Sequence, residues 1–380
     1  MNRALPLLPG ATVGVLGGGQ LGRMMAIAAR RMGYRICVLD RDPRCPTGQF
    51  ADDVVIGTLD DLESARCVAE RSAVVTLDTE HVPAEVLTAI AEIAPVRPGP
   101  SVLATIQDRA VQKAFLDRLG LPQAPWSAFA DDAELAAAVA RIGAPAIIKA
   151  RRAGYDGKGQ ARVEHAADAS AAWHRIGCPP ATVEGLVRFA REVSVVLARG
   201  VTGELAIYPI AENVHRHHVL HTTRAPAPMA DAQRARAEHI ATTIAKALDH
   251  VGVMAVEMFE LPDGTLLVNE IAPRTHNSGH YTYGACATSQ FEQHVRAVCG
   301  LPLGDPRQLT GAVMINLIGD LWANGEPHWQ HVLARPQARL HLYGKLAPAR
   351  GRKMGHVVVL DDDTDRALGS VDALLASLAT

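Results

Sequence analysis

Short hydrophobic blocks alternate with amphipathic segments along the first hundred residues of the chain. Four of these blocks have the length of single buried strands, namely residues 11–17, 34–40, 51–57 and 73–78. After the first block, apolar residues recur from Leu21 to Met32 at the spacing of one helical face. Strands that alternate with helices predict a parallel, doubly wound sheet, which we assign to an N-terminal domain of residues 1–110.

The middle of the chain has the pattern of a small α+β module, which we place at residues 111–190. Helices are predicted near residues 110–119 and 131–142, and the second helix leads into an apolar strand at 144–150. A polar, glycine-rich loop separates this strand from a further predicted strand at 161–165.

Predicted strands dominate the remaining chain, residues 191–380. One helix interrupts them, with Ile240, Ile244 and Leu248 on one face. The predicted strands are residues 192–200, 204–212, 253–260 and 266–272. The whole chain is therefore predicted to be α/β and α+β, with a mixed α+β C-terminal domain.

Composition and charge exclude several classes of protein. The 380 residues are too many for one compact core, and 48% of them are hydrophobic, so two or three globular domains are expected. The net charge of −2 gives no overall positive field, so we expect neither nucleic acid nor a membrane as partner. No apolar run approaches the ~20 residues of a membrane helix, and the N-terminus is not a convincing signal peptide. The six cysteines form no C-x-x-C pair, which favours scattered thiols in the cytoplasm.

The first chemical motif is the sequence GGGQLG, Gly17 to Gly22, which follows the first predicted strand and opens a helix. Glycines permit a ligand to approach the backbone, and N–H groups at a helix N-terminus can bind phosphate. Asp40 ends the next strand, where a dinucleotide-binding fold places its ribose carboxylate. The motif alone leaves three interpretations: a dinucleotide site, a phosphate site for another ligand, or a tight turn without a ligand.

A second motif combines Lys149, at the end of a strand, with the glycine-rich loop Gly154 to Gln160. Backbone N–H groups and ammonium groups in such a loop can neutralise a triphosphate during phosphoryl transfer. The loop lacks the G-K-[ST] sequence of a Walker A motif, and an ordinary exposed hairpin loop is the alternative.

Two glutamates form a third candidate site. Glu257 and Glu270 each lie within an apolar strand, and the turn sequence LPDG between the strands predicts a hairpin that brings the carboxylates together. Adjacent carboxylates repel one another unless a cation lies between them, and oxygen ligands suit Mg²⁺. Asn269 is a candidate for a further oxygen ligand. Solvated acids at strand ends are the alternative interpretation.

Two polar clusters suit an anionic substrate. The sequence RTHNSGH, residues 274–280, directly follows the second glutamate strand, with a purely structural loop as the alternative. A short basic run near the C-terminus suits one phosphate better than nucleic acid, with a solvated loop as the alternative. The run comprises Lys345, Arg350, Arg352 and Lys353.

Four histidines crowd one further segment, and they are His215, His217, His218 and His221. The segment has no nearby cysteine and is a predicted loop. A polar active-site loop or a plain surface loop is therefore favoured over a zinc site.

The order of four features resembles that found in the ATP-grasp ligases. These features are the lysine-ended strand, the loop GYDGKGQ, the segment EGLV and the paired glutamate strands. Within that superfamily, the chain is similar to the 5-(carboxyamino)imidazole ribonucleotide synthase family over about residues 13–359. The motifs that carry this likeness are GGGQLGRM, RRAGYDGKGQ, NEIAPRTHNSGH and GRKMGH. The related formate-dependent glycinamide ribonucleotide transformylases carry glutamate where Gln20 stands and aspartate where Asn277 stands. The chain therefore fits the carboxylating family better.

The resemblance implies an ATP-grasp fold in which the middle module is a lid domain. It implies carboxylation of 5-aminoimidazole ribonucleotide by ATP and bicarbonate through carboxyphosphate, with ADP and phosphate as products. Mg²⁺ is the implied metal cofactor, with Mn²⁺ as an alternative. The family likeness further implies a cytoplasmic homodimer in purine biosynthesis, whose product passes to a mutase.

By motif position, the resemblance also implies roles for individual residues. Those expected to bind ATP are Arg109, Lys149, Gly154, Gly157, Lys158, Gly159, Gln160, Glu184, Gly185, Leu186, Val187, Glu192, His215, Asn269 and Glu270. Those expected to hold the metal ion are Glu257 and Glu270. Those expected to bind the ribonucleotide are Gln20, Leu21, Glu80, His276, Asn277, Lys345, Arg352 and Lys353. Those expected to take part in catalysis are Lys149, Tyr155, Asp156, Lys158 and Arg274.

One departure and three alternatives accompany this interpretation. Arg188 and Arg191 flank Phe189 in the adenine-binding segment, where less basic residues are expected in the family. A dinucleotide-dependent oxidoreductase would leave the Lys149 loop and the paired glutamates unexplained. A non-catalytic nucleotide-binding regulator would not need the two polar substrate clusters. Another ATP-grasp ligase remains the runner-up within the same class.

Overall fold

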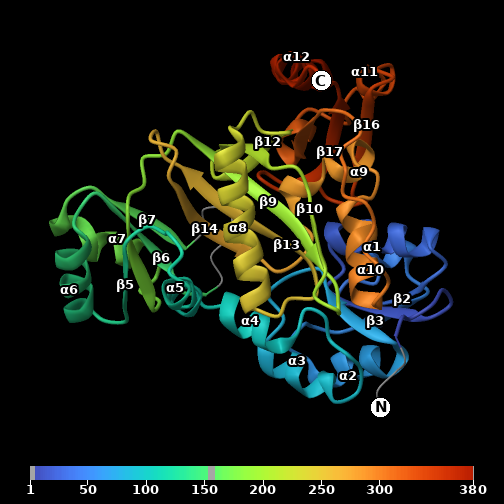
Figure 1. The fold of residues 1–380 in the computed structure, drawn as a ribbon, viewed down its shortest axis with the longest axis horizontal. Helices are drawn as coiled ribbons and strands as arrows, with labels where there is room; N and C mark the ends of the chain where they lie inside the picture. Colours follow the sequence, from blue (N-terminus) through green and yellow to red (C-terminus); the bar gives the residue numbers. More distant parts are fainter. Residues whose placement is uncertain (1–4, 153–158, 380) are drawn as a thin grey trace.

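The computed structural model describes residues 5–152 and 159–379 of the chain. Within these residues the strands form three sheets. Figure 1 shows them as separate parts of the molecule, with the large sheet between the N-terminal sheet and a small sheet. The sheets are ordered β3-β2-β1-β4, β5-β8-β6-β7 and β14-β13-β9-β11-β12-β15-β17-β16, with β10 paired to β9.

The N-terminal sheet is parallel, which confirms the predicted strand–helix alternation. Its strands bury alternate residues on opposite faces, so each face needs its own covering helices. Helices α2 (Leu62–Arg71) and α3 (Ala84–Ala91) cover one face, and α1 (Gln20–Arg31) covers the other. The strands are β1 (Thr12–Leu16), β2 (Arg35–Asp40), β3 (Asp53–Ile56) and β4 (Val74–Leu77).

Helix α10 (Gln290–Cys299) corrects the prediction that one helix interrupts the C-terminal strands. This helix packs beside α1 on the N-terminal sheet, with Phe291, Val295 and Val298 in the shared core (Figure 1). A distant segment of the chain therefore completes the N-terminal domain. The same helix also contacts β9 and β13, so it connects the N-terminal sheet to the large sheet.

The small sheet is antiparallel and has its own core, in which Phe129 and Trp173 pack edge to face. It confirms the predicted strands at 144–150 and 161–165 and adds two others. Its elements are β5 (Trp126–Phe129), α6 (Asp132–Ile142), β6 (Ala146–Ala150), β7 (Gln160–Val163), α7 (Ala169–Arg175) and β8 (Ala181–Gly185).

The large sheet carries the paired glutamates near its edge. Antiparallel pairing of β13 with β14 places Glu257 directly opposite Glu270. Helix α8 (Asp231–Ala247) covers this sheet with Ile240 and Ile244, as the apolar spacing predicts (Figure 1). The strands are β9 (Arg191–Arg199), β10 (Leu205–Ile207), β11 (Ala211–Arg216), β12 (Val219–Ala225), β13 (Gly252–Glu260), β14 (Leu266–Ala272), β15 (Ala312–Ile318), β16 (Ala338–Leu342) and β17 (Lys353–Leu360).

Shorter elements connect these layers. Single-turn 3₁₀ helices lie at Gly48–Phe50, Ala166–Asp168, Asn277–Gly279 and Gly319–Trp322. The remaining helices are α4 (Pro100–Ile106), α5 (Arg109–Arg118), α9 (Thr282–Ala285), α11 (Gln330–Leu333), α12 (Thr364–Gly369) and α13 (Val371–Leu378). Across the described ranges, none of the helices has the length and apolar character needed to cross a membrane.

Candidate active site

A single cavity of about 1710 Å³ joins residues of all three sheets. Residues at the carboxyl edge of the N-terminal sheet, on one face of the small sheet and on the large sheet contribute to its walls. Most of the predicted site residues line it. They are Gln20, Leu21, Glu80, Lys149, Gln160, Glu192, His215, Glu257, Asn269, Glu270, Arg274, His276, Asn277, Lys345, Arg352 and Lys353.

Several predicted ATP-binding residues lie behind the wall of this cavity or outside the described chain. Among the residues that the structure describes, those without a place in the lining are Arg109, Gly159, Glu184, Gly185, Leu186 and Val187. In the segment expected to hold adenine, Gly185 N already donates to Pro125 O at 2.9 Å, and Leu186 N donates to Pro145 O at 3.1 Å. The predictions for Gly154, Tyr155, Asp156, Gly157 and Lys158 fall outside the described residues.

The glycine motif forms the predicted turn between a strand and a helix, but side chains of the protein already bond its N–H groups. Gly18 N donates to Asp40 Oδ2 at 2.8 Å. The Asp78 carboxylate accepts from Gly19 N at 3.2 Å and from Gly22 N at 2.5 Å. These carboxylates occupy the positions in which a dinucleotide phosphate would bind. The geometry therefore disfavours the dinucleotide interpretation.

Three cations surround the buried carboxylate of Glu184 on β8. Lys149 Nζ lies 3.1 Å and Lys113 Nζ 3.3 Å from Oε2, and Arg109 Nη1 lies 3.6 Å from Oε1. Burial alone would raise the pKa of Glu184, but these cations lower it to about 2. The carboxylate therefore stays ionised and holds the three cations together, with Lys149 reaching the cavity. The excess of positive charge suits a polyphosphate.

Lys113 belongs to this group, although the sequence analysis did not single it out. It lies on α5, four residues after Arg109, so one helical face directs both cations toward Glu184. Its side chain is 2% exposed, and burial lowers its pKa. The spacing of the two cations on a predicted helix was the available signal.

The paired glutamates line the same cavity. Burial, followed by the charge of Glu270, raises the pKa of Glu257 to about 7, whereas the nearby imidazole of His215 opposes the rise. Within the described part of the chain, no cluster of three or more His, Cys, Asp or Glu side chains could hold a metal ion. Proteins nevertheless usually bind Mg²⁺ through only one or two carboxylates, while phosphate oxygens and water supply the other ligands.

The histidine-rich segment is a hairpin rather than an irregular loop. His217 and His218 form the two-residue turn between β11 and β12, with φ of 51° and 64°. His215 Nδ1 lies 2.7 Å from Glu192 Oε2 on the neighbouring strand. Burial tends to lower the pKa of His215, but the neighbouring carboxylate of Glu192 raises it. The segment contributes polar side chains to the cavity wall, which agrees better with the predicted polar loop than with a plain surface loop.

Glu80 and Arg274 form an ion pair between the N-terminal sheet and the loop after β14. The guanidinium bonds both oxygens of the carboxylate, with Nη2 2.9 Å from Oε1. Burial alone would raise the pKa of Glu80, but Arg274 lowers it to about 2. Arg274 therefore orients Glu80 at the cavity, and its charge is already partnered.

Asn277 presents an amide without protein partners to the same cavity. Its Nδ2 and Oδ1 are buried and, within the described residues, have no hydrogen-bond partner. Buried polar atoms without partners are costly, so a ligand that bonds both atoms would stabilise this arrangement. The adjacent His276 receives a hydrogen bond from Gln290 on its backbone carbonyl, which fixes the loop to α10.

The predicted basic run meets the cavity near the loop before β17. Lys345 Nζ donates to Lys353 O at 2.7 Å, and Arg352 Nη1 donates to Ala347 O at 2.7 Å. Burial, and then the charge of Arg352, lowers the pKa of Lys345 to about 8. Arg350 instead points outward, with its side chain 96% exposed. Lys345, Arg352 and Lys353 line the cavity, as does the exposed Arg350, so the basic run can present positive charge to an anion there.

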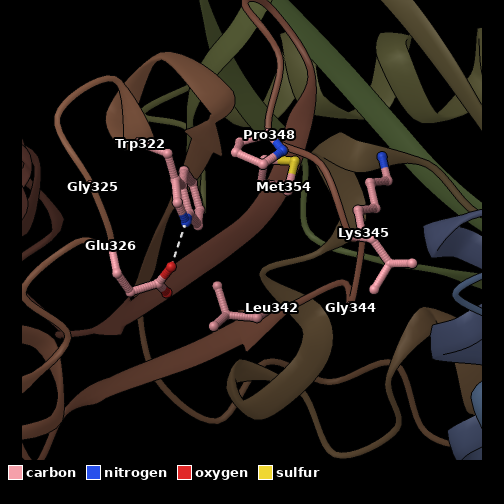
Figure 2. A pocket seen from close by; sticks show the side chains of 9 residues that line it. Trp322, Gly325, Glu326, Leu342, Gly344, Lys345, Pro348 and Met354 are labelled. Atoms are coloured by element: carbon pink, nitrogen blue, oxygen red, sulfur yellow. Dashed lines mark hydrogen bonds between the residues drawn. The ribbon is translucent and has the colours of Figure 1, made fainter.

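Lys345 also borders a smaller cavity of about 420 Å³, which Figure 2 shows from close by. Trp322 donates to Glu326 across this pocket at 3.0 Å, and Leu342 and Met354 give it an apolar wall (Figure 2). Gly344, beside Lys345, accepts a hydrogen bond from Gln49 of the N-terminal part at 2.9 Å. The loop that carries Lys345 is therefore anchored against the N-terminal domain.

The fold and the cavity define an ATP-grasp ligase. The ATP-grasp domain family matches residues 114–291, and the ribonucleotide synthetase preATP-grasp domain family matches residues 10–107. The phosphoribosylaminoimidazole carboxylase C-terminal domain family matches residues 312–369. An N5-carboxyaminoimidazole ribonucleotide synthase of Brucella melitensis is 45% identical over 353 residues, with 92% of this chain and 96% of the relative covered. The chain belongs to the N5-carboxyaminoimidazole ribonucleotide synthase family.

Further relatives agree with this assignment and confirm the predicted family and fold. The enzyme of the same description from Bacillus subtilis is 40% identical, with 94% of each chain covered. The crystal structure of an Aspergillus clavatus synthase in complex with ADP and 5-aminoimidazole ribonucleotide superposes with a TM-score of 0.89. That chain is 34% identical, with 97% of this chain and 98% of the other covered.

Proposed function

We propose that the chain carboxylates 5-aminoimidazole ribonucleotide with ATP and bicarbonate, giving N5-carboxyaminoimidazole ribonucleotide, ADP and phosphate in purine biosynthesis. The observation that carries this proposal is one cavity that joins a polyphosphate site to a second anion site. Lys149 and the Glu257–Glu270 pair line this cavity, and Lys345, Arg352 and Lys353 line it too. A ligase of this type must bind ATP and a phosphorylated acceptor at once.

The cation group around Glu184 supports the assignment of the ATP phosphates to the side of Lys149. The rings of Phe189 and Phe259 stack with their centroids 4.6 Å apart, and both line the cavity, where they suit a planar base. Arg191, one of the two residues that depart from the family pattern, also lines the cavity, and its charge is paired with Glu260 at 2.7 Å within the large sheet. Gln160 and Asn269 remain further ATP ligands in the proposal.

Mg²⁺, with Mn²⁺ as an alternative, would bind between Glu257 and Glu270, with Asn269 as a further oxygen ligand. The raised pKa of Glu257, which follows from its burial and from the charge of Glu270, supports a cation there because a cation would relieve both effects. When bound, such an ion neutralises phosphate oxygens during phosphoryl transfer.

The ribonucleotide would occupy the side of the cavity near the N-terminal sheet. Lys345, Arg352 and Lys353 would bind its 5′-phosphate, because charge-assisted bonds suit this group. Gln20, Leu21, Glu80, His276 and Asn277 would bind its ribose and imidazole, and Asn277 has two unused hydrogen-bonding atoms for that purpose. Glutamine at position 20 and asparagine at position 277 also favour this acceptor over glycinamide ribonucleotide.

The proposed reaction has two steps. A bicarbonate oxygen attacks the γ-phosphorus of ATP, the bond to ADP breaks, and carboxyphosphate forms. The ammonium of Lys149 stabilises the charge on the transferred phosphoryl group. The exocyclic amine then bonds the carboxyl carbon, directly or after release of carbon dioxide; phosphate leaves, and a base takes the amine proton. Tyr155 and Asp156 are the candidates for orienting bicarbonate or the amine, which Asp156 could also deprotonate, and Lys158 is the candidate for the γ-phosphate; all three lie outside the described residues.

The release of ADP tests this proposal most simply. ADP is measured with MgATP while 5-aminoimidazole ribonucleotide and bicarbonate are each present or omitted. The proposal predicts rapid ADP release only when both are present. Equal release without the ribonucleotide, or full activity with glycinamide ribonucleotide and formate, would contradict it.

We further propose a cytoplasmic homodimer, with domains at residues 1–110, 111–190 and 191–380. The six cysteines lie within the described ranges and are all free thiols, which fits a reducing compartment. A mutase is the proposed next enzyme, since an N-carboxylated amine must be consumed before it loses carbon dioxide. Light scattering on the purified chain of 40.5 kDa would test the dimer.

A further inference from the structure

The carboxylate of Asp78 lies between two backbone N–H groups that bracket Gln20 and Leu21. Asp78 directly follows β4, and its oxygens accept hydrogen bonds from Gly19 N at 3.2 Å and Gly22 N at 2.5 Å. Gln20 and Leu21, the two residues between these donors, both line the large cavity. The side chain of Asp78, directly after β4, therefore holds the first turn of α1 at the place where that turn lines the cavity.

The glycines of the motif fit this carboxylate. A Cβ atom on Gly19 would lie 2.4 Å from Asp78 Oδ2, and a Cβ atom on Gly18 would lie 2.4 Å from Cys45 Sγ and 2.7 Å from Asp40 Oδ2. Such distances exclude a side chain at either position. The motif GGGQLG is therefore required for the approach of internal carboxylates, and its resemblance to a dinucleotide-binding sequence follows from the same need for space.

Asp78 also faces cations from two other parts of the chain. Burial raises its pKa to about 6, while the N–H group of Gly22 and the charge of Arg274 oppose the rise, together with that of Lys345. The group is thus an anion at neutral pH. Its charge favours the N-terminal end of α1, which carries the positive end of the helix dipole.

We propose that Asp78 is a positioning residue for the ribonucleotide, which holds Gln20 and Leu21 in the geometry that the substrate requires. The inference rests on the proposed function, since it assigns Asp78 to the acceptor side of that reaction. Asp78 itself also lines the cavity, and because its oxygens are bonded to Gly19 and Gly22 it acts on the substrate through the backbone of α1. The same bonds exclude a phosphate from the end of the helix.

Replacing Asp78 by asparagine tests this role. The amide keeps the size of the carboxylate but loses its charge and one acceptor, so the first turn of α1 loses a charge-assisted bond. We expect the KM for 5-aminoimidazole ribonucleotide to rise about tenfold or more, with the KM for ATP changed less than about twofold. Asp40→Asn is the matched control, because Asp40 bonds the same glycine loop at Gly18 and has no place in the described lining of the cavity.

A second variant separates positioning from general stability. Asp78→Ala leaves space beside Gly19 and Gly22 for a small anion, so added formate should restore the ribonucleotide KM, whereas neutral formamide should not. Equal effects of Asp78→Asn and Asp40→Asn on both KM values would overturn the inference, as would an unchanged ribonucleotide KM in Asp78→Asn. Loss of the ribonucleotide dependence in the wild-type chain would refute the proposed function itself, and this inference with it.

Discussion

Replacement of Glu257 by glutamine should make the ligand-free protein more stable and the enzyme inactive. Glu257 lies opposite Glu270 on paired strands, and its side chain is 13% exposed. Its burial and the charge of Glu270 raise its pKa from 4.5 to about 7. An acid whose pKa is higher in the folded state than in the unfolded state stabilises the fold at pH values below its unfolded-state pKa. This stabilisation is lost as the pH rises through its folded-state pKa.

The size of the effect follows from these two pKa values. At ~1.4 kcal/mol per pH unit, the rise corresponds to about 3 kcal/mol that the metal-free wild type loses between about pH 4.5 and pH 8. Glutamine does not ionise, so the variant should lack this loss. At pH 8 its free energy of unfolding should therefore exceed that of the wild type by ~2–3 kcal/mol, and at pH 5 the two should be close.

Urea unfolding in EDTA at pH 5 and pH 8 measures this difference, and ADP release with MgATP measures the loss of function. The exposed Glu92 at the end of α3 provides a control, and Glu92→Gln should change neither property. A Glu257→Gln variant that is no more stable than the wild type at pH 8 would refute the electrostatic argument. A variant with near-normal turnover would refute the assignment of Glu257 to the metal ion.

Three further predictions concern other parts of the structure. Lys113→Met removes one of the three cations around Glu184, so the KM for ATP should rise about tenfold, whereas Arg118→Met on the exposed end of α5 should leave it unchanged. Asn277→Ala should raise the KM for the ribonucleotide far more than that for ATP, because both amide atoms await a ligand; equal changes would argue against the role. Burial lowers the pKa of His294 from 6.5 to about 3, so its share of stability is present above pH 6.5 and is lost as the pH falls below that value. His294→Gln should thus reduce the fall in unfolding free energy between pH 7 and pH 5 by about 2 kcal/mol, measured by urea titration; an unchanged fall would contradict this.

The parts of the fold that were predictable have a local signal. The strands of the N-terminal sheet are short apolar runs. The glutamate hairpin is set by a turn between consecutive strands, whose paired Glu257 and Glu270 are only 13 residues apart. Helix α10 has local signals too, since Ser289 accepts from Glu292 N and Gly300 ends the helix with φ of 71°. Its buried Gln290, Gln293 and His294 interrupt the apolar pattern, which explains why the helix was missed.

The features of the site that the sequence did not predict depend on contacts between distant segments of the chain. Nothing near Gly19 and Gly22 indicates that Asp78 bonds them, because β4 brings it there from a separation of 56 to 59 residues. The ion pair of Glu80 with Arg274 spans 194 residues. Lys113 has the appearance of an ordinary helix cation until the small sheet places Glu184 beside it. The order of the motifs therefore indicated which residues line the cavity. The hydrogen bonds and ion pairs among distant residues could be known only from the tertiary structure.

Oxygen transfer from bicarbonate to phosphate tests the central claim most directly. The enzyme is given ¹⁸O-labelled bicarbonate, MgATP and 5-aminoimidazole ribonucleotide in a short reaction, and the inorganic phosphate is analysed by mass spectrometry. Attack of a bicarbonate oxygen on the γ-phosphorus predicts one labelled oxygen in each phosphate released, in step with the carboxylated product. Phosphate that carries no label, or label that enters only from ¹⁸O-water, would contradict the account.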